Sequence, residues 1–136
     1  MQIDSTRFGR IEVDPDTVIE FPQPLAGFEN SRRYKLLHED VSNPIVMWLQ
    51  SLDEPDVSFG LIDPACIGIN YEITLDDSET ALLKISDPGT VSVLLMVRKE
   101  DNQLMPASHA PILINTAARL GMQKPGISAR IVFSNR

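Results

Sequence analysis

The 136-residue sequence has few of the residues that build reactive or metal-binding sites. It contains one cysteine, Cys66, and two histidines, His38 and His109, which stand 71 positions apart. A single cysteine excludes an internal disulfide, and its apolar neighbours predict a buried, unreactive thiol. Neither histidine has the spacing of a zinc ligand pair, so the sequence predicts no metal site and no cofactor.

Motifs of catalysis are also missing. The chain has no Gly-x-Ser-x-Gly segment and no glycine-rich phosphate loop, and its glycines stand alone, as in turns and bulges. The acidic pairs Asp53/Glu54 and Asp76/Asp77 could in principle act as acid and base. Adjacent carboxylates more often belong to solvated turns and helix caps, so we predict a protein that is not an enzyme.

Long hydrophobic runs are absent as well. No stretch reaches the roughly 18 apolar residues of a membrane span, and no apolar segment follows a positive cluster at the N-terminus. The composition, 43% hydrophobic and 23% charged, is typical of a globular protein, and the length leaves room for one core. We therefore expect a single domain over residues 1–136, located in the cytoplasm and not bound to a membrane.

Basic residues are scarce in the first part of the chain. Residues 1–80 contain 16 acidic and 5 basic side chains, whereas residues 81–136 contain 3 acidic and 7 basic ones, for a net charge of −7. Direct binding to nucleic acid is disfavoured, because phosphate neutralisation needs a basic stripe. The balance favours a basic protein partner, with simple solubility as the alternative explanation.

What the chain does contain is a series of short apolar runs cut by Pro, Gly, Asn and Asp. This pattern predicts an all-β fold, namely a small antiparallel β-barrel-like or sandwich domain with one short helix. The run at 91–97 is almost continuously apolar, which predicts a strand buried on both faces. The predicted strands are a hairpin around residues 7–10 and residues 18–21, 34–37, 45–51, 57–62, 91–97, 112–114 and 127–133.

One segment has the signals of a helix. Asp76 is a predicted N-cap, and Glu79 stands three positions later, as in a capping box. Apolar residues within 81–85 supply a stripe that can face a core, and Pro88 with the following glycine is expected to end the helix.

Residues 20–29, Glu-Phe-Pro-Gln-Pro-Leu-Ala-Gly-Phe-Glu, form a proline-rich loop that we call the ledge. Its two prolines exclude a regular helix or a central strand, and Gly27 can adopt a left-handed turn. Phe21, Leu25 and Phe28 must still find apolar cover. The ledge is therefore predicted to pack onto the core, and a preformed docking surface is the alternative.

Five short segments stand in a recognisable order and spacing: residues 21–28 (Phe-Pro-Gln-Pro-Leu-Ala-Gly-Phe), 48–51 (Trp-Leu-Gln-Ser), 57–59 (Val-Ser-Phe), 71–73 (Tyr-Glu-Ile) and 110–115 (Ala-Pro-Ile-Leu-Ile-Asn). Together they resemble the FliW family of flagellar assembly factors over nearly the whole chain. The departures are Pro24, where the family usually has glycine, and residues 105–109, which replace the usual approach to Ala-Pro.

The resemblance implies a cytoplasmic, non-enzymatic, β-barrel-like protein with two protein partners. Members of the family bind unassembled flagellin and also bind CsrA, a small basic RNA-binding repressor of flagellin translation. An amphipathic helical segment suits an apolar groove, and a basic partner suits an acidic surface. If one molecule cannot hold both partners, free flagellin releases the repressor and shuts down its own synthesis.

For CsrA we place the docking surface on acidic residues, with a solvated charge as the alternative at each position. They are Asp53, Glu54, Asp56 and, by the Tyr-Glu-Ile match, Glu72.

For flagellin the candidates are ledge residues and the 110–115 segment, with core packing as the alternative. They are Phe21, Leu25, Phe28, Pro111 and Asn115, whereas Trp48 is assigned to the core. A second function class is a β-barrel that binds a small ligand in its interior, an enzyme included. The strand at 91–97 offers only Ser92 as a polar group for such a cavity.

Overall fold

The computed structural model describes residues 2–38, 46–67, 69–70, 75–100, 103–107, 110–124 and 130–131. Its strands are β1 (Gln2–Ser5), β2 (Gly9–Glu12), β3 (Ile19–Glu20), β4 (Arg33–His38), β5 (Val46–Ser51), β6 (Ser58–Ile62), β7 (Ile69–Asn70), β8 (Val91–Glu100), β9 (Gln103–Pro106), β10 (Ile112–Asn115), β11 (Leu120–Gln123) and β12 (Arg130–Ile131). Its helix is α1 (Asp77–Leu82), and its 3-10 turns are η1 (Pro15–Thr17), η2 (Pro64–Ile67) and η3 (Pro88–Thr90).

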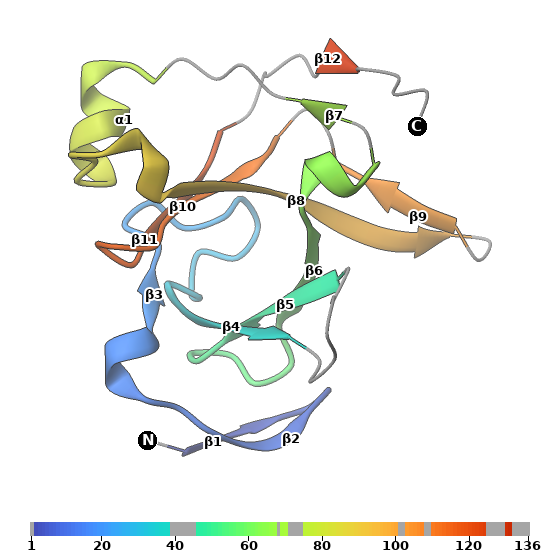
Figure 1. The fold of residues 1–136 in the computed structure, drawn as a ribbon. Coiled ribbons are helices and arrows are strands. Elements are labelled where there is room, and N and C mark those ends of the chain that lie inside the picture. Colours follow the sequence, from blue (N-terminus) through green and yellow to red (C-terminus); the bar gives the residue numbers. More distant parts are fainter. Residues whose placement is uncertain are drawn as a thin grey trace.

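Seven strands form a closed barrel. The order β10-β11-β3-β4-β5-β6-β8 returns to its start because β8 also pairs with β10. Each of these pairings is antiparallel except that of β3 with β11, which is parallel. β9 pairs with β8 outside the ring, and Figure 1 shows this hairpin projecting from the barrel. The all-β prediction is confirmed, and the architecture is the barrel.

The main core fills the barrel interior. Tyr34 on β4 and Phe21 just after β3 are fully buried, and their rings meet edge to face with centroids 5.1 Å apart. Leu49 on β5 and Leu61 on β6 belong to the same core cluster. Their side chains point into the barrel, and those of their neighbours along each strand point to the opposite face. Burying such aromatic and aliphatic side chains supplies the main driving force for this fold.

α1 covers part of the outer surface. Its predicted capping box is confirmed: the Asp76 carboxylate accepts from the Glu79 N–H, and the Glu79 carboxylate accepts from the Asp76 N–H. Leu83 packs against β10 and β11, and Lys124 pairs with Glu79 at 2.6 Å. The helix ends at Leu82, earlier than the predicted stop at Pro88, because Lys84 turns left-handed with φ 52°.

The predicted N-terminal hairpin is formed by β1 and β2 and lies beneath β4 and β5 in Figure 1. Its Ser5 hydroxyl donates to the buried Gln50 amide oxygen at 2.7 Å. Phe8 at its turn contacts Trp48 edge to face, with centroids 5.7 Å apart, and Arg7 lies 4.4 Å from that ring. The assignment of Trp48 to the core is wrong: it is half-buried and covered by these hairpin residues.

Other predictions needed correction. β7, β9 and β11 were not anticipated, since each is short and β11 carries Gly121 among polar and apolar residues. Among residues 91–98 of β8, whose burial the structure describes, Leu94 and Leu95 are the buried ones, whereas Ser92 is exposed. The strand predicted at 127–133 lies largely outside the described residues, which include β12 from it. The Cys66 side chain and His109 also lie outside them.

A substitution at Gly121 tests how closely the interior packs. A Cβ there would come within 2.6 Å of two ring atoms of Phe21, so Gly121→Ala forces the fully buried ring to move. We expect the free energy of unfolding in urea to fall by about 2 kcal/mol. Gly89→Ala is the control, because its Cβ would meet only the Asp87 side chain, and it should change stability by less than about 0.5 kcal/mol. Equal stability of the two variants would contradict this packing.

Candidate functional site

The predicted acidic residues Asp53, Glu54 and Asp56 lie together in the turn between β5 and β6, which we call the acidic turn. Asp53 is held firmly by β4 and the residue before it. Its carboxylate accepts from the N–H groups of Arg32 and Arg33, at 2.9 and 3.0 Å, and from the Arg33 guanidinium at 2.8 Å. The Asp53 carboxylate is therefore already used by the fold.

The pKa of Asp53 reflects this environment. Partial burial acts to raise it, but the N–H of Arg32 and the side chain, N–H and charge of Arg33 outweigh burial. The net result is a pKa below the ordinary value of 3.8. Asp53 stays ionised to a lower pH in the folded protein than in the unfolded chain.

Glu54 is also tied down, whereas Asp56 is open. Ser31 donates to the Glu54 carboxylate, and Ser51 donates to Ser31 at 2.9 Å beneath it. Asp56 is exposed, and its carboxylate makes no hydrogen bond or ion pair with any residue that the structure describes. Glu72 lies outside the described residues. Of the four predicted acidic residues, Asp56 is the one that the structure presents unengaged.

The ledge packs onto the core of the barrel, as predicted, rather than forming a docking surface with its large apolar side chains. Phe21 and Leu25 are 0% and 2% exposed, so their side chains offer no surface to a partner. Phe28 is half-buried and meets Phe59 edge to face, with centroids 4.8 Å apart. Gly27 has φ 84°, which agrees with the predicted left-handed turn.

Asn115 holds the outer turns of the barrel together. Its Nδ2 donates to the carbonyls of Leu83 and Lys84, at 2.8 and 3.3 Å. Its Oδ1 accepts from the Thr90 hydroxyl at 2.9 Å and from the Ala117 N–H at 3.1 Å. Asn115 is 2% exposed and Pro111 is buried, so core packing rather than a partner contact accounts for both positions.

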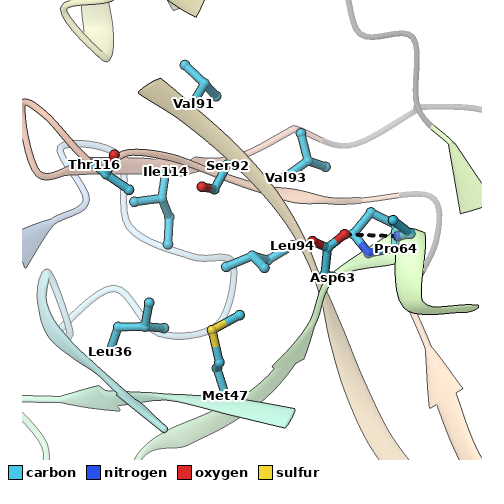
Figure 2. Close-up of a pocket in the computed structure, with 11 residues that line it drawn as sticks. Leu36, Met47, Asp63, Pro64, Val91, Ser92, Val93, Leu94, Ile114 and Thr116 are labelled. Carbon is cyan, nitrogen blue, oxygen red and sulfur yellow. Dashed lines mark hydrogen bonds between the residues drawn. The ribbon is translucent and has the colours of Figure 1, made fainter. Parts of the chain in front are cut away.

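A hollow of about 440 Å³ opens at one end of the barrel, and we call it the mouth hollow. Figure 2 shows Leu36 and Met47 on one side of it, facing Ser92 and Ile114 on the other. Its wall is mainly apolar. Ile114 comes from the predicted 110–115 segment and lines the hollow, but it is 1% exposed and, like Pro111 and Asn115, offers little surface to a partner.

The polar groups of the mouth hollow are few. The Asp63 carboxylate accepts from the Ala65 N–H at 2.9 Å, and the Thr116 hydroxyl donates to the Thr90 carbonyl at 3.0 Å. Within the described residues, no group of three or more His, Cys, Asp and Glu is arranged to hold a metal ion. The described helices include none long and apolar enough to cross a membrane.

Sequence reasoning missed the residues that carry these surfaces. The mouth hollow joins four strands, and no local pattern reveals which residues meet at its rim. Ser31 has no local signal of a role, and Ser51 stands at the end of the predicted strand 45–51, although both are fully buried. An aromatic residue within a predicted turn was the available signal for Phe8, which is 38% exposed.

Comparison with known proteins gives a consistent result. A protein-family model described as "FliW protein" matches residues 2–130. "Flagellar assembly factor FliW" of Azoarcus sp. strain BH72 is 44% identical, covering 91% of this chain and 90% of the relative. The same-named protein of Chromobacterium violaceum is 36% identical, covering 98% of each. A crystal structure of the flagellar assembly factor FliW has a TM-score of 0.84 at 26% identity, covering 100% of this chain and 99% of that one.

The hydrogen bonds of Asp53 predict a pH-dependent contribution to folding. It is complete above the pKa of the unfolded chain, near 3.8, and is lost as pH falls through the lower pKa of the folded protein. Asp53→Asn should cost about 1 kcal/mol at neutral pH, because Arg33 is half exposed and solvent screens the pair.

Urea unfolding at a series of pH values from neutral to strongly acidic measures the difference in free energy of unfolding between the wild type and Asp53→Asn. This difference should shrink towards zero in acid. Asp16→Asn, which removes an exposed carboxylate on η1, is the matched control for loss of one charge. A difference that stays constant across the series would show that Asp53 does not stabilise the fold as an ion.

Proposed function

The chain belongs to the FliW family of flagellar assembly factors, and we propose that it works as a cytoplasmic, non-enzymatic binder of unassembled flagellin and of CsrA. In this proposal flagellin and CsrA oppose each other on one molecule, so that the level of free flagellin sets the translation of flagellin. Such a switch requires only that each partner lower the affinity for the other.

The observation that carries the proposal is the presence of two chemically different surfaces at opposite ends of β5. Met47 near the start of β5 lines the mouth hollow, and Ser51 at its end leads into the acidic turn. Six residues of strand span about 17 Å. One small barrel therefore presents an apolar recess and an acidic surface to different partners.

The acidic surface suits a basic partner such as CsrA. Asp56 is exposed, and the Thr6 N–H donates to the Pro55 carbonyl at 3.0 Å, which places the β1–β2 hairpin beside the acidic turn. The hairpin itself adds no net charge, because Asp4 and Glu12 are balanced by Arg7 and Arg10, and Arg10 pairs with Asp4 at 3.5 Å. The exposed Asp56 carboxylate would attract a basic protein and speed its association. Glu72 remains a proposed member of this surface.

The mouth hollow suits a flagellin helix. An amphipathic helix binds by placing anchoring side chains in an apolar groove, and this recess is lined by the half-buried Leu36 and Met47, together with the buried Ile114. We place flagellin here rather than on the ledge, since Phe21 and Leu25 are buried. The same recess serves the second function class, a small-ligand barrel, but its polar side chains are few: Asp63 and Thr116 already bond to backbone, and Ser92 adds one hydroxyl.

Charge reversal at Asp56 tests the acidic surface. Asp56→Lys should weaken CsrA binding about ten-fold at low salt, because it replaces an attraction with a repulsion. Titration calorimetry at increasing salt should show the difference disappearing as exposed charges are screened. Asp77→Lys on α1 changes net charge equally and should leave the affinity near wild type. Salt-independent CsrA binding would rule out the acidic-surface mechanism.

Filling the mouth hollow tests the flagellin site. Ser92 is exposed at its rim, so Ser92→Trp adds bulk without removing a core contact. We expect flagellin binding to weaken at least about ten-fold, while CsrA binding and the thermal midpoint stay unchanged. Ser92→Ala is the matched control and should bind flagellin normally. Wild-type flagellin affinity in the tryptophan variant would place flagellin elsewhere on the protein.

A further inference from the structure

A second hollow, of about 310 Å³, lies beside the parallel pairing of β3 and β11, and we call it the basic hollow. Cations from three separate elements line it: Arg33 from β4, Lys84 from the turn after α1, and Arg119 from the turn before β11. This concentration of positive charge is notable in a chain with a net charge of −7. Neither Lys84 nor Arg119 lines the mouth hollow, and neither belongs to the acidic turn.

The backbone at two of these cations is strained. Lys84 and Arg119, with φ 52° and 57°, are the non-glycine residues of the described chain that have positive φ. Glycine adopts this conformation without steric cost and is the usual residue at such helix ends and turns. Each turn instead carries a long cationic side chain, and both side chains line the same hollow. Backbone strain of this kind is often associated with function.

One buried residue, Asn115, fixes both turns, one through its side chain and the other through its backbone. Asn115 Nδ2 donates to the Lys84 carbonyl at 3.3 Å, and the Asn115 carbonyl accepts from the Arg119 N–H at 2.7 Å. The Arg119 carbonyl in turn accepts from the Glu20 N–H at 3.0 Å, which ties the turn to β3. The two cations are thus attached to a common rigid support. Asn115 acts as a positioning residue for this hollow.

The remaining wall selects among anions. Val18 and Leu120 are half-buried apolar residues, and Glu20 adds one carboxylate to the lining. Arg33 is partly neutralised by Asp53, at 2.8 Å. A singly charged group with an aliphatic stem matches this mixture of apolar wall and modest positive charge. A phosphate dianion has no stem to bury, so it would leave the apolar wall of Val18 and Leu120 without contact.

We propose that the basic hollow binds the carboxylate of an acidic residue, or of a chain terminus, of another polypeptide. Lys84 and Arg119 hold the carboxylate oxygens, and Val18 and Leu120 contact the methylene stem. Charge-assisted hydrogen bonds from two cations on fixed turns give such a site its selectivity, and the Arg119 guanidinium is also held by the Pro15 carbonyl at 3.1 Å. This assignment does not depend on which surface takes flagellin or CsrA.

NMR titration of the isotope-labelled full chain at low salt tests the proposal. The probes are N-acetylglutamate methylamide for a side-chain carboxylate, N-acetylglycylglycine for a terminal one, and inorganic phosphate. We expect saturable shifts of the Lys84, Arg119 and Glu20 amide signals with a carboxylate probe, and weaker binding of phosphate. The tighter of the two carboxylate probes identifies the source.

Four variants separate binding from folding. Lys84→Gly and Arg119→Gly each remove a charge and relieve the positive φ, so each should weaken binding about five-fold. The thermal midpoint should stay equal or rise in Lys84→Gly and stay near wild type in Arg119→Gly, which also loses the bond from the Arg119 guanidinium to the Pro15 carbonyl. Lys84→Arg keeps the charge and should bind the probe as wild type does. Glu20→Gln removes the opposing carboxylate and should tighten binding.

Three results would overturn the proposal. The first is the absence of saturable shifts at these amides, and the second is unchanged binding in the glycine variants. The third is phosphate binding as tight as that of either carboxylate probe. A fall in thermal midpoint of the glycine variants, with binding retained, would assign Lys84 and Arg119 to the fold alone.

Discussion

The closure of the barrel between β3 and β11 is the constraint on which the rest of the structure depends. The two strands share a single parallel register pair, Glu20 with Leu120. The next residue, Phe21, turns inward and occupies the space that Gly121 leaves by having no side chain. One register pair and the packing of one aromatic ring therefore hold together two strands that a longer ladder of hydrogen bonds would otherwise join. Because the chain is fixed at this point, the ledge that follows has little freedom and packs as a cover.

Buried polar side chains extend this order to the surface turns. Asn115 joins the end of α1, η3 and the β10–β11 turn, and Ser51 donates to Ser31 while accepting the N–H groups of Asp53 and Glu54. Such groups are costly to bury unless their hydrogen bonds are complete, so each holds its neighbours in one geometry. The turns that present charge to solvent are consequently fixed by groups that no partner can reach.

The sequence was sufficient for the longer strands and the helix but not for how the chain closes on itself. Alternation and capping signals are local, which is why β4, β5, β6 and the cap of α1 were predicted. β11 becomes a strand only through its partners, and its glycine weakens any local signal. The same holds for the site. Asp53 is recognisable as acidic, but its bonds come from Arg33, 20 positions away, and such pairing leaves no trace in the local sequence.

If flagellin and CsrA bind at opposite ends of the barrel, as we propose, an element between them that has two arrangements would let each lower the affinity for the other. A partner that binds equally well to both arrangements shifts nothing. The β4–β5 strand pair connects the two ends. Leu36 and Met47 line the mouth hollow at one end, and Arg33 donates to Asp53 at the other. A helix inserted between Leu36 and Met47 would push β4 and β5 apart. Because Arg33 lies on β4 and Asp53 directly follows β5, such a movement would also disturb the Arg33–Asp53 contact. If the β4–β5 strand pair does not change its arrangement, this coupling is lost and both partners can bind at once.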